Sequence, residues 1–561
     1  MKIAVRGATG IIPKTAPELT PPNAATIARD CFLLNGNIGP IYNASSYGTT
    51  GISNPDTIFR FVDAPGTTPE FMAFVQDANV AIIPFGTTFH YAITGLGIVP
   101  QTTTYSLATT GTGNYPITTR PLGLPMPTTA PVVAPPGGGT PVVRSYAYTW
   151  ITDWNEESMP SVASTAATGD ANGSWTVAMS AAPTSFNGLT LGPIRRKLYR
   201  TEGTSAQFQL VAIEPAVGAW TNNQYVDSIL DTALPGDALV SADWAAPPST
   251  MQGGVLHPSG MLLGFDGQTL YVSEAFQPHA YPAQYQLYTE YPIVGIAVAG
   301  TSVVVCTTAY PYLLIGTTPG QMYLQRSAEP LPCLSKRGIV CMGSAVVFPS
   351  TYGLVSVDIN SGTSIITETI FDYREWQARQ PSTMFGSYAM GRIHMYSPGL
   401  ASDQWLIIDA RENIATTFDQ TATAFHTDTI TGEHLFASGT TVKLFDDTTQ
   451  TPLTYTWQSK MFVMPHPLNF GAARINFDPA VTNPSVTFTV YSDNDSTTTG
   501  MVQRFTKVIT SRTPFRLPAG FKSYRWQFSV VGTDLVKSIE LAETVQNLDA
   551  ISQFDMMNTA Q

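Results

Sequence analysis

Short apolar runs that alternate with polar positions recur along this chain, and glycine or proline separates most of them. The clearest example is LHPSGMLLGFDGQTLYVSEAFQPHAYP (256–282), where apolar runs at 261–265 and 269–272 flank Asp266-Gly267. Asp-Gly between such runs is a strong hairpin signal, because a type I′ turn needs positive φ at both central residues. We therefore predict a β-hairpin here, followed by a loop of proline and aromatic residues at 276–282.

Units of this kind repeat after the hairpin at intervals of about 40 residues, the spacing of propeller blades with four strands each. Five units are predicted within 251–450, and they begin near residues 256, 293, 338, 382 and 422. A further group of alternating runs lies at 54–98. The cadence predicts an all-β fold with a β-propeller core of about six units.

The remaining segments predict two sandwiches and few helices. The runs SYAYTWIT (145–152) and IRRKLYRT (194–201) belong to a stretch whose strand density is typical of an immunoglobulin-like or fibronectin type III sandwich. The predicted organisation is an N-terminal arm with a short helix over 22–34 (1–50), a first propeller unit (51–120), a proline- and glycine-rich linker (121–143), a fibronectin III-like sandwich (144–248), the remaining propeller units (249–451), a C-terminal β-sandwich (452–545) and a tail (546–561).

Composition narrows the class of protein. Charged residues make up 12% of the chain, the formal net charge is −12, and no basic cluster exceeds Arg195-Arg196-Lys197. Specific nucleic-acid recognition needs a basic footprint, so we do not expect it. The cysteines at 31, 306, 333 and 341 form no CxxC pair, which indicates buried thiols in a reducing compartment. No signal-peptide core and no apolar run long enough to span a membrane is expected.

Candidate chemistry is sparse. The sequence contains no GxxxxGK[ST], HExxH or Gly-x-Ser-x-Gly motif. Acidic pairs occur at Asp153 with Glu156-Glu157, Asp227 with Asp231, Asp446-Asp447, and Asp493 with Asp495. Two carboxyls can serve a glycosidase and the last pair could hold calcium, but turn capping is the more common role of such residues. The histidine pairs 257 with 279 and 426 with 434 lack a third ligand at zinc spacing. We predict no catalytic, cofactor-binding or metal-binding residues.

Tyrosines gather at positions 281, 285, 288 and 291, within eleven residues. Such a group can form a sugar-binding platform or a subunit interface, because tyrosine combines a large apolar area with a polar tip. It can equally serve packing between propeller units. The sequence leaves these alternatives open.

Four segments resemble the tail nozzle proteins (tail tubular protein B) and related tail hub proteins of short-tailed bacteriophages. The opening segment IPKTAPELTPPNAATIARDCFLLNGNIGP (12–40) is similar to the family's N-terminal arm, and the segment at 256–282 is similar to one of its blades. The C-terminal runs TWQSKMF, FRLPAGF and SIELAETVQNL resemble the sandwich of such structural proteins. The pattern YAYTWITDWNEESMPS with RRKLYRT resembles the fibronectin III-like insertions of phage tail proteins.

This resemblance implies a non-enzymatic virion protein of the phage tail, assembled in the host cytoplasm. It would form a homo-oligomer, a hexameric ring below the portal and head-to-tail adaptor, which conducts and gates DNA during ejection and contacts tail fibre or spike proteins. An acidic lumen lets double-stranded DNA pass with only non-specific contact. Two other classes stay open: a propeller-type carbohydrate-binding receptor adhesin that uses Tyr281–Tyr291, and a polysaccharide-degrading enzyme.

Overall fold

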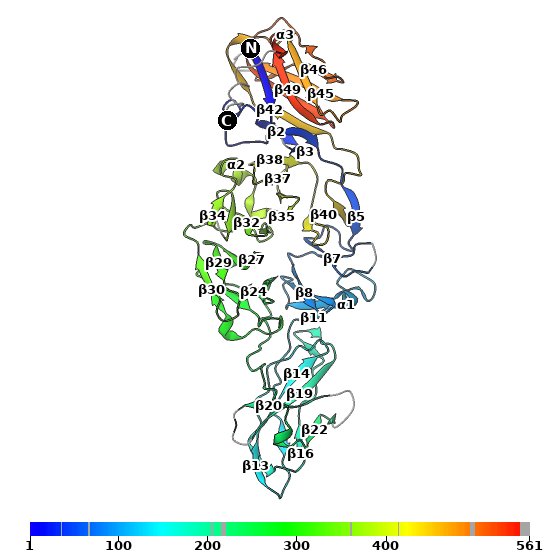
Figure 1. Ribbon diagram of the computed structural model, residues 1–561, viewed down its shortest axis with the longest axis vertical. Helices are drawn as coiled ribbons and strands as arrows, with labels where there is room; N and C mark the ends of the chain where they lie inside the picture. The colour runs from blue at the N-terminus through cyan, green and yellow to red at the C-terminus, as the bar shows by residue number, and fades with distance from the viewer. Residues whose placement is uncertain are drawn as a thin grey trace. The chain divides into compact units, whose positions relative to one another are not determined.

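The computed structural model describes residues 1–34, 36–65, 68–202, 205, 207–214, 220–359, 362–412, 414–493 and 500–549. The chain divides into two compact units, one formed by Met1–Ile58 with Leu331–Gln561 and the other by Phe59–Pro330. Strands dominate both units, and the α-helices of the described ranges are short: α1 (Tyr105–Thr109), α2 (Tyr373–Ala378) and α3 (Val545–Asp549). The prediction of an all-β fold is confirmed (Figure 1).

Outside residues 122–251, the described part of the chain contains six sets of four antiparallel strands, and we call each of these sets a blade-like sheet. The sheets of the Phe59–Pro330 unit are β8 (Asn79–Phe85), β9 (Thr88–Thr94), β10 (Gln101–Thr104) and β11 (Arg120–Pro121); β23 (Gln252–Leu256), β24 (Leu262–Asp266), β25 (Thr269–Val272) and β26 (Leu287–Tyr288); and β27 (Ile293–Ala299), β28 (Ser302–Thr307), β29 (Tyr312–Ile315) and β30 (Tyr323–Arg326).

The other unit contains the remaining three blade-like sheets. They are β31 (Val340–Cys341), β32 (Ala345–Pro349), β33 (Leu354–Asp358) and β34 (Gly362–Ile365); β35 (Phe385–Ala389), β36 (Arg392–Tyr396), β37 (Trp405–Asp409) and β38 (Ile414–Phe418); and β39 (Ala424–Thr427), β40 (His434–Ser438) and β41 (Thr441–Leu444), to which the N-terminal strand β5 (Ser45–Thr49) adds as the fourth. A two-stranded sheet pairs β6 (Thr57–Arg60) with β7 (Phe71–Phe74).

The first strands of successive blade-like sheets pack against each other within each unit. In one unit β23 contacts β8 and β27, and in the other β35 contacts β31 and β39. Apolar side chains fill the space between facing sheets, as Leu263 and Val305 do between the sheets of β24 and β28. This is the way in which propeller blades pack face to face.

The hairpin predicted over 261–272 is confirmed as β24 and β25, but its turn differs from the prediction. Asp266 pairs with Thr269, so the two central residues are Gly267 and Gln268. Gly267 has positive φ, at +58°, whereas Gln268 and the preceding Asp266 do not. Glycine at the first central position is the pattern of a type II′ turn. The predicted type I′ turn centred on Asp266-Gly267 is therefore wrong by one residue.

A two-sheet sandwich is inserted between the blade-like sheets of β8–β11 and β23–β26. One sheet contains β14 (Tyr146–Thr152), β19 (Ile194–Thr201) and β20 (Phe208–Ile213), and the other contains β12 (Val132–Ala134), β16 (Trp175–Ala178), β22 (Gln224–Asp227) and β21 (Trp220–Thr221). Two smaller pairs are β13 (Pro141–Arg144) with β15 (Ala167–Asp170) and β17 (Ser185–Phe186) with β18 (Leu189–Thr190). Tyr148, Trp175 and Leu198 are buried in the shared core.

The predicted linker at 121–143 is in part sandwich structure. β12 pairs with β16, and β13 pairs with β15. Val133 and Val142 pack against the sandwich core, which gives these segments a reason to be ordered. Prolines are compatible with this arrangement because β12 and β13 are edge strands. At the edge of a sheet, a proline can lack its N–H without breaking a hydrogen bond to a neighbouring strand.

The predicted N-terminal arm and its helix over 22–34 are wrong. Residues 25–29 and 31–34 form β2 (Ala25–Arg29) and β3 (Cys31–Leu34). Asp30, which lies between them, has φ of +55°, a left-handed conformation that no right-handed helix tolerates. β2 pairs with β42 (Tyr455–Ser459), so contacts with distant sequence override the local helical spacing.

The C-terminal sandwich uses strands from both ends of the chain. One sheet contains β3, β4 (Asn37–Pro40), β49 (Val536–Ala542), β44 (Ala472–Phe477) and β47 (Phe515–Arg516), with β1 (Lys2–Arg6) paired to β49. The facing sheet contains β42, β48 (Ser523–Gly532), β45 (Val486–Asp493), β46 (Val502–Ile509) and β43 (Phe462–Leu468), and β2 joins it to β35–β38. Figure 1 shows β2 and β3 in blue among the orange and red C-terminal strands. The predicted tail begins with helix α3, whose Leu548 is buried, and residues 550–561 lie outside the described residues.

Candidate functional site

A cavity of about 420 Å³ lies at the first strands of the three blade-like sheets in the unit that contains both chain ends. Its lining comprises Ile339, Val340, Cys341, Gly386, Ser387, Tyr388, Thr427 and Thr429. These residues offer hydroxyls and a thiol beside apolar carbon, and none of them is charged. The volume lies in the range of small-ligand sites. We take this cavity as the candidate binding site.

Hydrogen bonds fix the cavity wall. The Thr427 hydroxyl donates to the Tyr388 carbonyl at 2.8 Å, which ties β39 to β35. The Ser387 hydroxyl lies 3.2 Å from Nδ1 of His434, a fully buried residue of β40. A side chain at position 386 would collide with the buried Sδ of Met395, so Gly386 allows β35 to pack closely against its neighbours.

The four cysteines form no disulfide with one another. Cys31, Cys306 and Cys333 are buried as predicted, whereas Cys341 is exposed and lines the cavity. Burial raises the pKa of the Cys31 thiol far above its usual value. The prediction of four buried thiols is thus wrong for Cys341, because β31 is only two residues long and its end faces solvent.

We expect one of the four thiols to react in the native protein. Treating the native protein with a water-soluble maleimide at neutral pH should add one label, on Cys341. Treating the denatured protein should add four labels. Intact-protein and peptide mass spectrometry measure both numbers. A Cys341→Ser variant serves as the control, and labelling of that folded variant would contradict the assignment.

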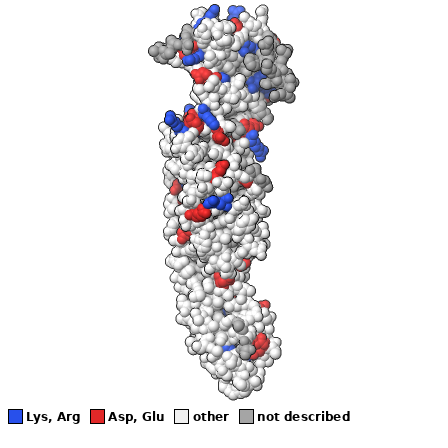
Figure 2. Space-filling view, turned by 90° about the vertical axis from the view of Figure 1, so that its left-hand side faces the viewer, with Lys and Arg blue, Asp and Glu red and all other residues white. Residues whose placement is uncertain are grey.

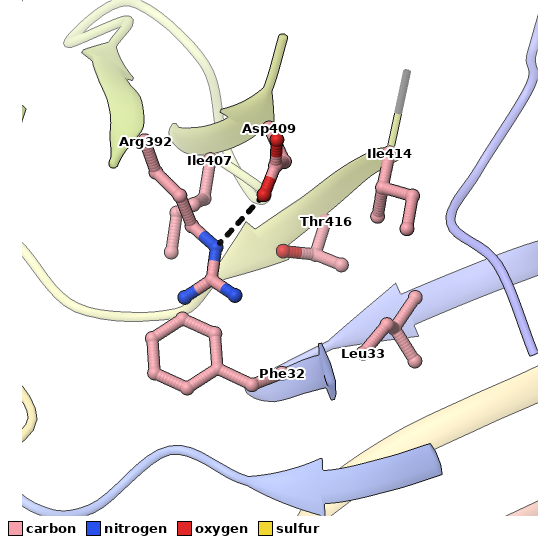
Figure 3. Close-up of a pocket in the computed structure, with 7 residues that line it drawn as sticks. All are labelled: Phe32, Leu33, Arg392, Ile407, Asp409, Ile414 and Thr416. Atoms are coloured by element: carbon pink, nitrogen blue, oxygen red, sulfur yellow. Dashed lines mark ion pairs between the residues drawn. The ribbon is translucent and has the colours of Figure 1, made fainter. Parts of the chain in front are cut away.

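A second, very small pocket lies between β3 and the sheet of β36–β38 (Figure 3). The guanidinium carbon of Arg392 lies 4.2 Å from the centre of the Phe32 ring, and Nε lies 3.9 Å from the Asp409 carboxylate. Burial lowers the pKa of Arg392. The free volume is about 10 Å³, room for one water molecule. This pocket is a packing contact that fastens the N-terminal hairpin β3–β4 to a blade-like sheet.

The acidic residues at 153–157 form ion pairs and hydrogen bonds with other residues of the chain. Asp153 pairs with Arg120 at 2.7 Å, and the guanidinium of Arg120 lies 4.1 Å from the Trp154 ring centre. Glu157 is buried and accepts hydrogen bonds from Thr149, Lys197, Tyr199 and Ser241. Desolvation raises the pKa of Glu156 to about 7. These contacts fix the turn after β14 and hold it against β11.

The loop at 276–282 meets the same turn. Nε2 of the buried His279 lies 3.1 Å from both the main-chain nitrogen and the main-chain oxygen of Glu157. Burial lowers the pKa of His279 to about 4, so its neutral form is favoured. Phe276 is 76% exposed and has φ of +59°, a strained conformation for an aromatic residue. The loop thus contacts the chain's own sandwich through His279 and presents Phe276 to solvent.

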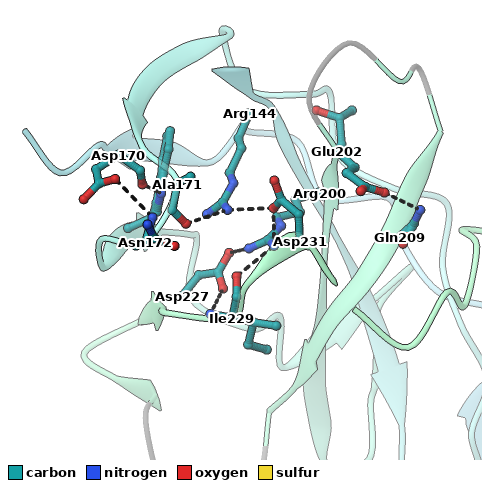
Figure 4. Close-up of polar contacts among 12 residues, drawn as sticks. Arg144, Asp170, Ala171, Asn172, Arg200, Glu202, Gln209, Asp227, Ile229 and Asp231 are labelled. Carbon is teal, nitrogen blue, oxygen red and sulfur yellow. Dashed lines mark hydrogen bonds and ion pairs between the residues drawn. The ribbon is translucent and has the colours of Figure 1, made fainter. Parts of the chain in front are cut away.

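Asp227 and Asp231 neutralise two buried arginines (Figure 4). Arg200 pairs with Asp227 and, at 2.7 Å, with Asp231, which also pairs with Arg144 at 2.6 Å. The Tyr146 hydroxyl donates to Asp227 at 2.9 Å. Arg144, Arg200 and Asp227 are fully buried. We call these four charged residues the sandwich charge cluster; its two positive and two negative charges balance.

The remaining acidic pairs have turn or ion-pair roles. Asp447 accepts hydrogen bonds from the main chain and hydroxyl of Thr449, the turn-capping role expected of it. Asp446 accepts from the Tyr42 main chain at 2.8 Å, and burial raises its pKa to about 6. Asp493 pairs with Arg525 at 3.5 Å, whereas Asp495 lies outside the described residues.

Of the two histidine pairs noted in the sequence, His257 and His279 have separate partners, whereas His426 lies close enough to His434 to add to the effect of burial in lowering its pKa. His257 contacts the Thr301 carbonyl and His279 contacts Glu157. Within the described ranges, no three His, Cys, Asp or Glu side chains converge in a way that could hold a metal ion. His434 also packs against His394 of β36, with ring centres 4.2 Å apart and ring planes tilted by 32°. Sequence reasoning missed His394, and its only signal is an imidazole inside the apolar strand RIHMY.

The tyrosine group does not form one platform. Tyr281 is 3% exposed, and the Tyr285 hydroxyl donates to Glu274 at 3.0 Å. Tyr288 is 69% exposed, and Tyr291 packs on Tyr310 with ring centres 5.8 Å apart. Packing therefore accounts for Tyr281, and only Tyr288 presents most of its ring to solvent.

Charged side chains are few on the face in Figure 2, which is mostly white. Blue and red side chains lie beside one another in some places and stand apart in others. Arg326 and Glu290 form such an exposed pair, at 2.6 Å. No helix in the described part of the chain is long and apolar enough to span a membrane.

Comparison with protein-family models and with curated proteins gives no match. Among solved structures, the chain is similar to BamB from Moraxella catarrhalis, with 12% identity and a TM-score of 0.24 over 66% of this chain and 99% of that one. It is also similar to the AfRom2 CNH domain (12%, TM-score 0.25, 50% of this chain and 87% of that one) and to the N-terminal domain of Nup159 (9%, TM-score 0.21, 52% and 91%). All three are β-propeller-type structures, and this degree of similarity assigns no family.

Proposed function

We propose that this protein is a non-enzymatic structural protein of a bacteriophage tail. It assembles into a ring, a nozzle or hub below the portal and adaptor, which conducts and gates DNA during ejection. The resemblance of four segments to tail nozzle proteins supports this role. So do the repeated blade-like sheets, which we interpret as a propeller, and the inserted sandwich, which we interpret as fibronectin III-like.

The observation that carries the proposal is that strands within residues 1–49 pair with strands far along the chain. β1 pairs with β49, β2 with β42, and β5 with β41. The ends are also linked by an ion pair between the N-terminal ammonium group and Glu543. A pull on either end would have to break several strand pairings at once. Such a closed arrangement suits a part of a particle that withstands internal pressure.

The charge of the chain fits the same role. A net charge of −12 repels the DNA phosphates, so DNA could pass without adhering. Few charged side chains also mean little desolvation cost when large surfaces are buried between subunits. The expected partners are further copies of the chain, the head-to-tail adaptor and the tail fibre or spike proteins, in the virion tail.

Mass photometry of the purified full-length protein, from nanomolar to micromolar concentration, tests the proposal. We expect a closed assembly of defined mass, near six copies, to replace the monomer as concentration rises. Fluorescence anisotropy with a short DNA duplex at physiological salt should show no tight binding. A protein that stays monomeric throughout and binds the duplex tightly would contradict the role.

A carbohydrate-binding adhesin is the second candidate, and the cavity at Cys341 favours it. Hydroxyl groups of Ser387, Thr427 and Thr429 beside apolar carbon match the surface of a neutral sugar. Glycan-array binding that Thr429→Val abolishes, and that Thr431→Val outside the cavity leaves intact, would support this candidate. Absence of glycan binding in the wild type would remove it.

A further inference from the structure

His394 and His434 form a buried contact between two blade-like sheets. His394 lies on β36 and His434 on β40, both are 0% exposed, and their ring centres are 4.2 Å apart. Aromatic rings enclose the pair: Trp405 lies 5.9 Å from His394, and Phe425 lies 4.9 Å from His434. The second of these sheets is the one that the N-terminal strand β5 completes.

The hydrogen bond from Trp405 opposes an added proton on Nδ1 of His394. The indole N–H of Trp405 donates to Nδ1 of His394 at 3.2 Å. Nδ1 is therefore the unprotonated nitrogen of a neutral ring, and a proton added there would face the indole hydrogen. On His434, Nδ1 lies 3.2 Å from the Ser387 hydroxyl, while Nε2 has no hydrogen-bond partner among the residues described.

The nearby positive charges also oppose protonation. Arg392, on the same strand as His394, and His426 of β39, near His434, both disfavour a positive imidazole. Lys443 of β41 lies over the neighbouring Phe436 ring. Asp428 and Glu433 lie in the turn between β39 and β40, where a main-chain hydrogen bond joins them. Two imidazolium ions 4.2 Å apart in this apolar box would repel each other strongly.

We propose that the His394–His434 contact is an acid-sensitive lock between the sheet of β35–β38 and the sheet of β39–β41 with β5. At neutral pH both rings are uncharged and the sheets stay packed. Acidification favours an opened state in which the rings reach water and take up protons. Ser387 belongs to the lock and to the cavity wall, so opening also changes the candidate binding site.

The direction of the pH effect follows from proton linkage. Burial lowers the pKa of His394 to about 3 and that of His434 well below its usual value. Both rings therefore bind protons more readily in the opened state. The lock is fully effective above the ordinary histidine pKa of 6.5, and it weakens as pH falls from 6.5 toward 3.

Hydrogen exchange of the full-length protein tests the lock. Peptides covering 45–49 and 424–444 are followed by mass spectrometry at pH 7.5 and 5.0, and rates are corrected for intrinsic chemical exchange. The wild type should lose at least about tenfold protection at pH 5.0, the effect of one pKa unit. His434→Phe, which cannot titrate, should lose much less.

Two further variants make the result decisive. His466→Gln alters an exposed histidine on β43 and should keep the wild-type pH dependence. His394→Gln retains an oxygen to accept the Trp405 hydrogen bond and replaces His434→Phe should the latter not fold. Equal loss of protection at pH 5.0 in the wild type and in His434→Phe, or in His394→Gln if that variant is used instead, would overturn the proposal. No loss of protection in the wild type would also overturn it.

Discussion

Replacing Val5 with aspartate is expected to unfold the C-terminal sandwich or to lower its free energy of unfolding by more than about 3 kcal/mol. Val5 is 2% exposed in β1, and it packs in the core formed by both ends of the chain. A carboxylate there would lose its hydration without gaining a partner. Chemical denaturation followed by the fluorescence of the buried Trp457 and Trp526 measures the change.

Leu19→Asp is the matched control for this prediction. Leu19 belongs to the same N-terminal segment but is 79% exposed, so its replacement should change stability by less than about 0.5 kcal/mol. If residues 1–50 formed a free arm, both variants would behave like wild type. Equal, negligible effects would therefore contradict the strand pairings of β1.

Asp227→Asn is expected to destabilise the inserted sandwich by about 3–5 kcal/mol, because it leaves Arg200 buried with an excess of positive charge. Arg200, Asp227 and Tyr146 share one hydrogen-bonded group, and all three are fully buried. Hydrogen exchange of peptides from β14, β19 and β22 measures the loss of protection in the sandwich itself.

Arg326→Gln provides the comparison for the charge cluster. Arg326 and Glu290 are 47% and 60% exposed, so breaking this surface pair should change the free energy of unfolding far less than Asp227→Asn does. A similar, small effect of both substitutions would show that Asp227 is not required to neutralise Arg200. It would also contradict the burial of the cluster.

Local sequence was sufficient for the features whose partners are close in the chain. The β24–β25 hairpin joins residues at most nine apart, and its apolar alternation and Gly267 specify it. Asp447 caps its own turn through Thr449, two residues away. In both cases the residues that cause the structure lie within a few positions of one another in the chain.

Features that depend on distant partners were missed. Residues 25–34 have helix-like apolar spacing, but the partner of β2 lies more than 400 residues further along the chain. The role of Asp227 depends on Arg200, and that of His434 depends on His394, each on another strand. No local pattern shows which strands will become neighbours, so these contacts could not be derived before the fold was known.

Negative-stain electron microscopy of the purified full-length protein tests whether it forms a ring. We expect end-on views of closed rings with a central opening, built from a fixed number of identical subunits near six. A field of separate single-copy particles at micromolar concentration, with no ring in any view, would contradict it.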